Sequence, residues 1–140
     1  MTRIGPILAA LAAGIFIGAL LTPVLSGAAD RRVYELRTYT THDGKLDALH
    51  ARFRTHTMRL FEKHGMTNVA YWTPQDPELG SKTLVYLLAH RSRDAAARSW
   101  EAFRNDPEWV KVKTESEAQG PILIKVESVF GDPTDYCPLK

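Results

Sequence analysis

Three side chains on one predicted strand, Glu35, Arg37 and Tyr39, are of types that bind or transform small molecules. They lie in the run 33–40, whose β-branched and aromatic residues favour a strand. Alternate residues of a strand point to the same face, so the three side chains share one surface. A carboxylate desolvated in a cavity has a raised pKa, which suits it to proton abstraction from a bound substrate.

Two more charged side chains, Lys125 and Glu127, show the same alternation in the predicted strand 122–130. If that strand lies beside the run 33–40, four charges gather on one surface between two sheets. With Trp109 at the rim, this surface is a candidate small-molecule cavity. The competing interpretation, which we favour, is an ion-pair network that satisfies itself at an interface between two chains.

The remaining polar residues contain no metal or nucleophile motif. His50 and His64 lie about 21 Å apart along one predicted helix, too far for one metal ion. The sequence has no H-E-x-x-H, P-loop, G-x-G-x-x-G or nucleophile-elbow pattern. It therefore predicts neither a metal nor a cofactor. A haem held by His90 as its lone protein ligand is the third-ranked hypothesis. Cys137, the single cysteine, excludes an internal disulfide and is interpreted as an incidental thiol.

The order of the predicted elements is strand, helix, strand, strand, helix, strand. This order is typical of an α+β, ferredoxin-like βαββαβ fold, a four-stranded antiparallel sheet with its helices on one face. Trp100 and Phe103 fall on the inner side of the second helix, where we interpret them as core. The predicted strands are 33–40, 67–73, 83–90 and 122–130. One helix is predicted from 45 to 64 and a second from 92 onward, and a short helix restarts at 106. Residues 74–81 are predicted to be a loop.

The third strand, 83–90, is apolar on both faces, although two helices can cover only one face of the sheet. An uncovered apolar face of roughly several hundred Å² is unusual on a monomer. We therefore expect a homodimer in which two sheets pack face to face, as a two-chain α/β barrel. The alternative is that the C-terminal tail and the short third helix cover this face.

The 140 residues fit one domain behind an apolar leader. No charged side chain occurs from Ile4 to Leu25, a helix length of about 33 Å that is enough to cross a bilayer. Small residues at 26–30 resemble a signal-peptidase site, with cleavage after Ala28 or Ala29, and Gly14 and Gly18 have the spacing of a helix-packing motif. We expect residues 1–30 to be a signal peptide or membrane anchor, and residues 31–140 to be a periplasmic or extracellular domain.

An ordered set of short motifs resembles the NIPSNAP family, which belongs to the dimeric α/β barrel group. The resemblance implies a ferredoxin-like fold and association through the sheet, and it carries no catalytic residue onto this chain. Cys137 departs from it, since a serine is more usual there. The motifs are Tyr34-Glu35-Leu36-Arg37-Thr38-Tyr39, Gly44-Lys45, His64-Gly65, Asp106-Pro107-Glu108-Trp109 and Asp135-Tyr136-Cys137-Pro138-Leu139.

The leading hypothesis for function is a small-molecule-binding or protein-interaction module on the outer side of a membrane. The second is a cofactor-independent enzyme of the monooxygenase or isomerase type, using Glu35, Arg37 and Tyr39 in the cavity. A haem-binding protein is third. Nucleic-acid binding is excluded by the net charge of +2 and the absence of a basic stripe.

Overall fold

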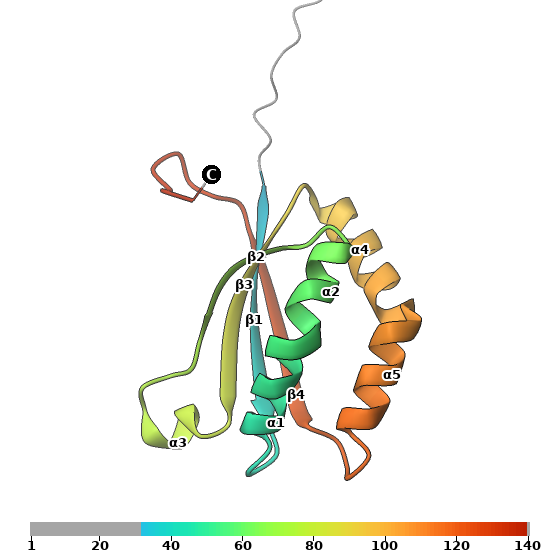
Figure 1. Cartoon of the computed structure of the whole chain (residues 1–140). Helices are drawn as coiled ribbons and strands as arrows, with labels where there is room; N and C mark the ends of the chain where they lie inside the picture. Colours follow the sequence, from blue (N-terminus) through green and yellow to red (C-terminus); the bar gives the residue numbers. More distant parts are fainter. Residues whose placement is uncertain (1–31, 140) are drawn as a thin grey trace, which may run out of the picture.

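One antiparallel sheet of four strands organises the fold, and helices cover one of its faces (Figure 1). The computed structural model describes residues 32–139. The strand order is β2-β3-β1-β4, which places the first strand between the third and the fourth. The predicted α+β, ferredoxin-like arrangement is confirmed. The strands are β1 (Val33–Thr41), β2 (Thr67–Trp72), β3 (Thr83–His90) and β4 (Leu123–Gly131).

The first predicted helix is present over its length but contains a π-helical turn. The segment consists of α1 (Leu46–Arg52), the π turn η1 (Phe53–Thr57) and α2 (Met58–Lys63). The second helical region is split at Asp106, whose extended backbone ends α4 (Arg93–Asn105) and whose side chain caps α5 (Pro107–Ser116). Proline at the first position of α5 is compatible with this start, because the N–H that it lacks has no partner there in any helix.

The predicted loop 74–81 contains one helical turn, α3 (Pro77–Gly80). The Asp76 side chain accepts hydrogen bonds from the backbone N–H groups of Glu78 and Leu79, and Pro77 fixes the first helical position. An N-cap followed by proline is a helix start. The prediction of a loop was wrong for these four residues, because proline interrupts a helix in its interior but is compatible with its first turn.

The core lies between the sheet and the helices and is rich in aromatic rings. Tyr86 is fully buried at the centre of β3, with the rings of Tyr39 and Phe53 edge-on to it at centroid distances of 5.1 Å and 5.3 Å. From α2 and α4, Phe61 and Trp100 meet edge to face at 5.3 Å. Such edge-to-face pairs add to the stabilisation from burial alone.

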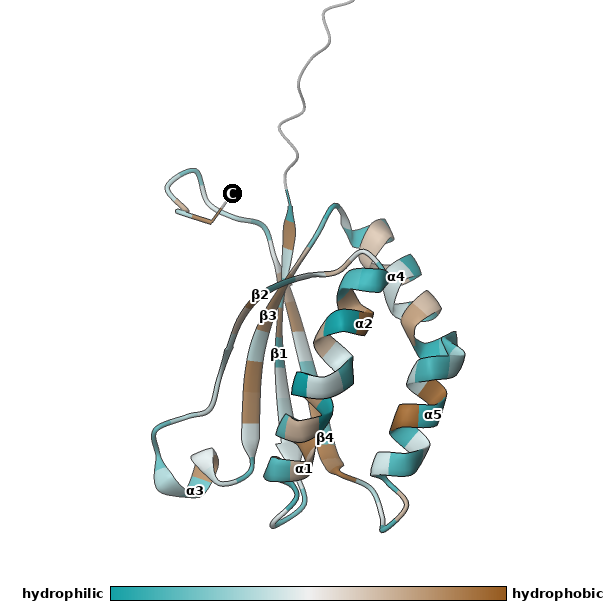
Figure 2. Ribbon diagram, in the orientation of Figure 1, coloured by the Kyte–Doolittle hydropathy of each residue, from teal (hydrophilic) through white to brown (hydrophobic). Residues whose placement is uncertain are grey.

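The other face of the sheet, which we name the helix-free face, is not covered by α1, α2, α4 or α5 (Figure 1). Its apolar side chains include Leu36, Trp72 and Val129, which are exposed, and Val85 and Leu87, which are partly buried. The register places these residues side by side, since Leu36 pairs with Leu87 on one side and Val129 on the other. With α5 and the tail 132–139 in place, Leu36, Trp72 and Val129 remain exposed, so these segments do not bury them. The helix α5 packs instead against α1, η1 and α4. Figure 2 shows apolar stretches along β3 and β4.

Among residues 32–139, the structure contains no helix with the length and apolar character needed to span a bilayer. The predicted leader, with its apolar run from Ile4 to Leu25, lies outside the described residues.

We expect Leu49→Ala to lower the free energy of unfolding by about 2–5 kcal/mol, because Leu49 is 0% exposed and its removal leaves a cavity. The matched control is Leu79→Ala in α3, where the side chain is 53% exposed and the loss should stay within about 0.5 kcal/mol. Urea unfolding of both variants measures the difference. Equal losses would contradict the described core.

Candidate functional site

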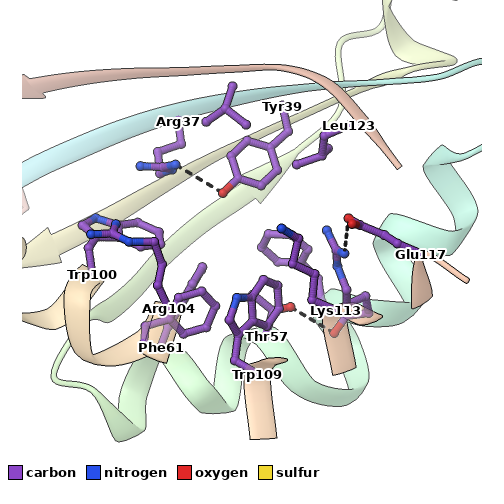
Figure 3. A pocket seen from close by; sticks show the side chains of 14 residues that line it. Arg37, Tyr39, Thr57, Phe61, Trp100, Arg104, Trp109, Lys113, Glu117 and Leu123 are labelled. Atoms are coloured by element: carbon purple, nitrogen blue, oxygen red, sulfur yellow. Dashed lines mark hydrogen bonds and ion pairs between the residues drawn. The ribbon is translucent and has the colours of Figure 1, made fainter. Parts of the chain in front are cut away.

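A cavity of about 260 Å³ lies between the sheet and the helices (Figure 3). Arg37, Tyr39 and Leu123 lie on its sheet side, with Trp100, Trp109 and Lys113 on its helix side. The full lining is Arg37, Tyr39, Arg52, Phe53, Thr57, Phe61, Trp100, Phe103, Arg104, Trp109, Lys113, Glu117, Leu123 and Val126.

The π turn contributes Phe53 and Thr57 to this lining. The Thr57 hydroxyl donates to the backbone carbonyl of Arg52, five residues earlier, at 3.2 Å. Both Arg52 and Phe53 are buried on the inner side of this helical segment. Single π turns inside α-helices occur frequently at functional sites, so this irregularity supports a role for the cavity.

Each of two guanidinium groups lies over an indole ring. The Arg37 Cζ is 4.2 Å from the Trp100 ring centre, and the Arg52 Cζ is 5.2 Å from that of Trp109. A planar cation is attracted to the negative face of an aromatic ring. The two arginines and two tryptophans therefore form a polarised wall rather than a purely apolar one.

The lining carries four cationic side chains, Arg37, Arg52, Arg104 and Lys113, and one carboxylate, Glu117. Glu117 is already used, since its Oε1 accepts a hydrogen bond from Arg52 Nη1 at 3.0 Å. The Nε atoms of Arg37 and Arg52 are buried and have no hydrogen-bond partner among the described residues. The cavity therefore has an excess of positive charge and two unsatisfied N–H donors.

Behind Arg37, the buried carboxylate of Glu35 accepts four hydrogen bonds. Its Oε1 atom accepts from Arg37 Nη1 at 2.6 Å and from Ser128 Oγ at 2.7 Å. Its Oε2 atom accepts from Trp100 Nε1 at 2.7 Å and from His90 Nε2 at 2.8 Å. The donors come from β1, β4, α4 and β3, so one carboxylate joins three strands to a helix.

These hydrogen bonds determine the ionisation of Glu35. Burial alone raises the pKa of this carboxyl, but the four donors, His90 foremost, outweigh burial and lower the pKa from its ordinary value of 4.5 to about 2. The expectation of a raised pKa suited to proton abstraction was wrong. Glu35 lies behind the cavity wall and is not part of the lining. The competing ion-pair network is present, but beneath the helices of a single chain.

Lys125 and Glu127 lie away from this cavity, so the expected gathering of four charges on one surface was wrong. In the register, Thr40 pairs with Lys125 and Thr38 with Glu127, which places both charges on the helix-free face. There they form an exposed ion pair with each other, 2.8 Å apart. The strand is apolar on both faces, so alternation alone did not reveal which residues of β4 point toward the helices.

Of the other predicted site residues, Arg37, Tyr39 and Trp109 line the cavity. Trp100, interpreted as core, is indeed largely buried, and it also lines the cavity. The sequence pattern did not predict that the cations Arg52, Arg104 and Lys113 belong to the lining. A signal for two of them was present, because Arg104 follows Trp100, and Lys113 follows Trp109, by four residues. That spacing puts each pair on one helix face.

The histidines contribute no metal site. No group of three metal-ligating side chains occurs within residues 32–139. His64 Nε2 instead lies 2.7 Å from Oδ2 of Asp106. Hydrogen bonds from Lys63, His64 and the backbone N–H of Glu108 hold the pKa of Asp106 well below its usual range. His90 Nε2 is hydrogen-bonded to Glu35, so this ring nitrogen is not available to ligate a haem iron.

We expect Glu35→Gln to lower the free energy of unfolding at neutral pH by about 3 kcal/mol, because it leaves the buried Arg37 charge without its partner. The stability from a lowered carboxyl pKa is present above about pH 4.5 and is lost as the pH falls toward 2. Between pH 7 and pH 3 the free energy of unfolding should therefore fall less for the variant than for the unaltered protein. Chemical unfolding at both pH values measures this difference.

The control for this substitution is Glu127→Gln, which breaks the exposed pair with Lys125 and should cost less than about 1 kcal/mol. If both variants behaved alike at pH 7 and pH 3, the Glu35 network would not have the role assigned to it.

The described domain is similar to proteins of known structure. A NIPSNAP family protein of unknown function from Agrobacterium tumefaciens is 20% identical with a TM-score of 0.68, covering 80% of this chain and 96% of that one. An uncharacterised NIPSNAP domain protein from Burkholderia xenovorans is 24% identical with a TM-score of 0.64, covering 76% and 98%.

A more distant neighbour is SnoaB, a cofactor-independent oxygenase from Streptomyces nogalater. It is 15% identical with a TM-score of 0.50, covering 77% of this chain and 98% of that one. The fold is therefore shared with an oxygenase, and at this identity the likeness extends to the fold alone.

No curated protein matches the chain. The family model described as NIPSNAP matches residues 34–138, which is nearly all of the described domain. The match agrees with the fold, with the neighbouring structures and with the motifs of the sequence. The chain belongs to the NIPSNAP family.

Proposed function

We propose that this domain is a binding module whose cavity holds a small, flat organic anion. The observation that carries the proposal is the pair of buried Nε donors, on Arg37 and Arg52, that have no acceptor among the described residues. A buried donor without an acceptor costs roughly 1–3 kcal/mol, and a bound carboxylate or phenolate oxygen would recover this energy. Hydrogen bonds between two charged groups are stronger than neutral ones.

The walls determine the shape of the ligand. Trp100, Trp109, Phe61 and Phe103 present flat apolar surfaces on the helix side, and Tyr39 faces them from the sheet. At about 260 Å³ the cavity is just below the usual range for drug-sized ligands, so one or two fused rings are a suitable size. Arg104 and Lys113 add positive charge to the same lining, which favours the approach of an anion.

A cofactor-independent oxygenase is the second candidate function. It is supported by the shared fold of SnoaB, and of a monooxygenase from Streptomyces coelicolor solved with nanaomycin D, which is 12% identical with a TM-score of 0.50. The acid–base groups favour binding over this alternative. Glu35 is a weak base with a pKa of about 2, and the lining carboxylate Glu117 is paired with Arg52.

We also propose that two copies associate through the helix-free face of the sheet. The proposal is supported by the exposed apolar side chains Leu36, Trp72 and Val129 on neighbouring strands. Large exposed apolar patches on soluble proteins mark interaction surfaces. Because the sheet of one copy presents this surface, a second copy offers a matching one.

The subcellular location of the domain is proposed from the sequence. The uncharged run from Ile4 to Leu25 supports export or tethering, which would place the domain in the periplasm or outside the cell. An anion-binding module at that location would meet its ligand outside the cytoplasm.

The binding proposal is tested with 2-naphthoate and its neutral analogue 2-naphthylmethanol, followed by quenching of tryptophan fluorescence. We expect the carboxylate to bind at least about tenfold more tightly, because only it satisfies the two arginines with a charged acceptor. Lys113→Glu should weaken naphthoate binding by about tenfold, whereas Lys111→Glu, two residues earlier in α5 and outside the cavity lining, should have little effect. Equal binding of the acid and the alcohol would rule out anion recognition. Oxygen consumption with either compound would favour the oxygenase.

The association proposal is tested by sedimentation at micromolar concentration. We expect the unaltered protein to be a dimer and Val129→Glu, at a side chain 65% exposed on the helix-free face, to be a monomer. A buried unpaired carboxylate is too costly for the interface to tolerate. The control is Val110→Glu in α5, where a 50% exposed valine lies outside the proposed interface. A monomeric unaltered protein would contradict the proposal.

A further inference from the structure

A second hollow of about 680 Å³ opens where the end of α2, the first turns of α4 and the ends of β2 and β3 meet. Arg32, Glu62, Gly65, Met66, Thr67, Asn68, Ala89, His90, Arg91, Ala95, Arg98 and Ser99 form its lining. None of these residues belongs to the lining of the cavity described above. We name this hollow the end cleft.

The end cleft is positively charged. Arg32, Arg91 and Arg98 contribute three guanidinium groups against one carboxylate, Glu62. The Glu62 carboxylate already accepts a hydrogen bond from the Asn68 side chain at 3.0 Å, through its Oε1 atom. Guanidinium groups present forked N–H donors that match the oxygens of carboxylates and phosphates.

His90 is the unusual member of this lining, because it is only 1% exposed and one of its nitrogens has no partner. Its Nε2 lies 2.8 Å from Glu35 Oε2, and since that carboxyl is ionised, Nε2 carries a proton and donates. Its Nδ1 is buried without a hydrogen-bond partner among residues 32–139. Buried polar atoms are nearly always satisfied, and His90 is a lining residue of the end cleft, so a ligand bound there is the natural source of the missing partner.

We propose that the end cleft binds a phosphate monoester group. A neutral His90, with its proton held on Nε2, needs a donor at Nδ1, and the monoanion of a phosphate monoester has one P–O–H group that can donate. If the ring carries a second proton, Nδ1 donates instead, and an unprotonated phosphate oxygen accepts. A carboxylate anion can only accept, whereas a phosphate monoester can donate as its monoanion and accept as its monoanion or dianion, so it satisfies His90 in both protonation states.

Other groups of the end cleft match this ligand. The three arginines oppose the phosphate charge, and the Ser99 hydroxyl is a further donor or acceptor in the lining. Ala95 lies in the first turn of α4, where the helix dipole contributes partial positive charge. The hollow is much larger than a phosphate ion, so it has room for the small organic group that carries the phosphate.

The proposal is tested with the full 140-residue chain in neutral detergent micelles, labelled with ¹⁵N-histidine. Titration with glycerol 3-phosphate should move the His90 Nδ1 resonance in a saturable way. Arg98→Ala and Arg91→Ala should each weaken binding by about tenfold, because each removes a charged donor to the phosphate. Arg54→Ala removes the same charge outside the end cleft and should leave the affinity unchanged.

A parallel titration with dihexanoyl phosphatidic acid, below its critical micelle concentration, separates the two sources of a phosphate monoester. Binding at least tenfold tighter than that of glycerol 3-phosphate identifies a lipid headgroup, and equal or weaker binding identifies a water-soluble ester. The proposal is overturned if neither compound moves the His90 resonance, or if Arg98→Ala and Arg91→Ala bind both compounds like the unaltered protein. Naphthoate binding is measured in a separate cavity, so either proposal can fail alone.

Discussion

The carboxylate of Glu35 is the interaction on which the arrangement of this domain depends. An ionised carboxylate is costly to bury unless hydrogen bonds satisfy its oxygens, and here each oxygen accepts two of them. Because the donors belong to three strands and α4, the ion is satisfied only when the helix lies at one height and angle on the sheet. The same bonds hold the Trp100 indole and the Arg37 guanidinium in the cavity wall, where they stack 4.2 Å apart.

The hydrogen-bonded Glu35 carboxylate also limits the acid–base chemistry of the neighbouring cavity. With a pKa of about 2, Glu35 stays ionised at neutral pH and is too weak a base to take a proton from most organic acids. Its charge offsets that of Arg37 in part, yet the guanidinium still has an Nε donor without an acceptor. The cavity therefore attracts and orients an anion more readily than it creates one by deprotonation. The chemistry of the site resides in its cations and aromatic walls.

The sequence was sufficient for the fold because periodicity and turn residues are local signals. β1 was assigned the correct face for Arg37 and Tyr39, since its charged and apolar residues alternate in a distinctive way. β4 was not, because its apolar residues occur on both faces and its register depends on the pairing with β1. The direction of the Glu35 pKa shift could not be predicted from the sequence either. Two of the donors to this carboxylate, Ser128 and Trp100, lie 93 and 65 residues away along the chain. A carboxylate's ionisation depends on its donors, and only the tertiary structure brings them together.

Each hollow has one lining residue that is hydrogen-bonded to the Glu35 carboxylate. Through Oε1 it holds Arg37 at the aromatic cavity, and through Oε2 it holds the imidazole of His90, whose other nitrogen is left for the end cleft. The cavity lies on the helix side of the sheet and the end cleft lies where β2 begins and β3 ends, whereas Leu36, Trp72 and Val129 lie on the opposite face. Association through that face would bury Leu36 and Val129 and leave the cavity between the sheet and the helices uncovered. The proposed pairing and the cavity between the sheet and the helices are therefore physically compatible within one molecule, because they use opposite faces of the same sheet.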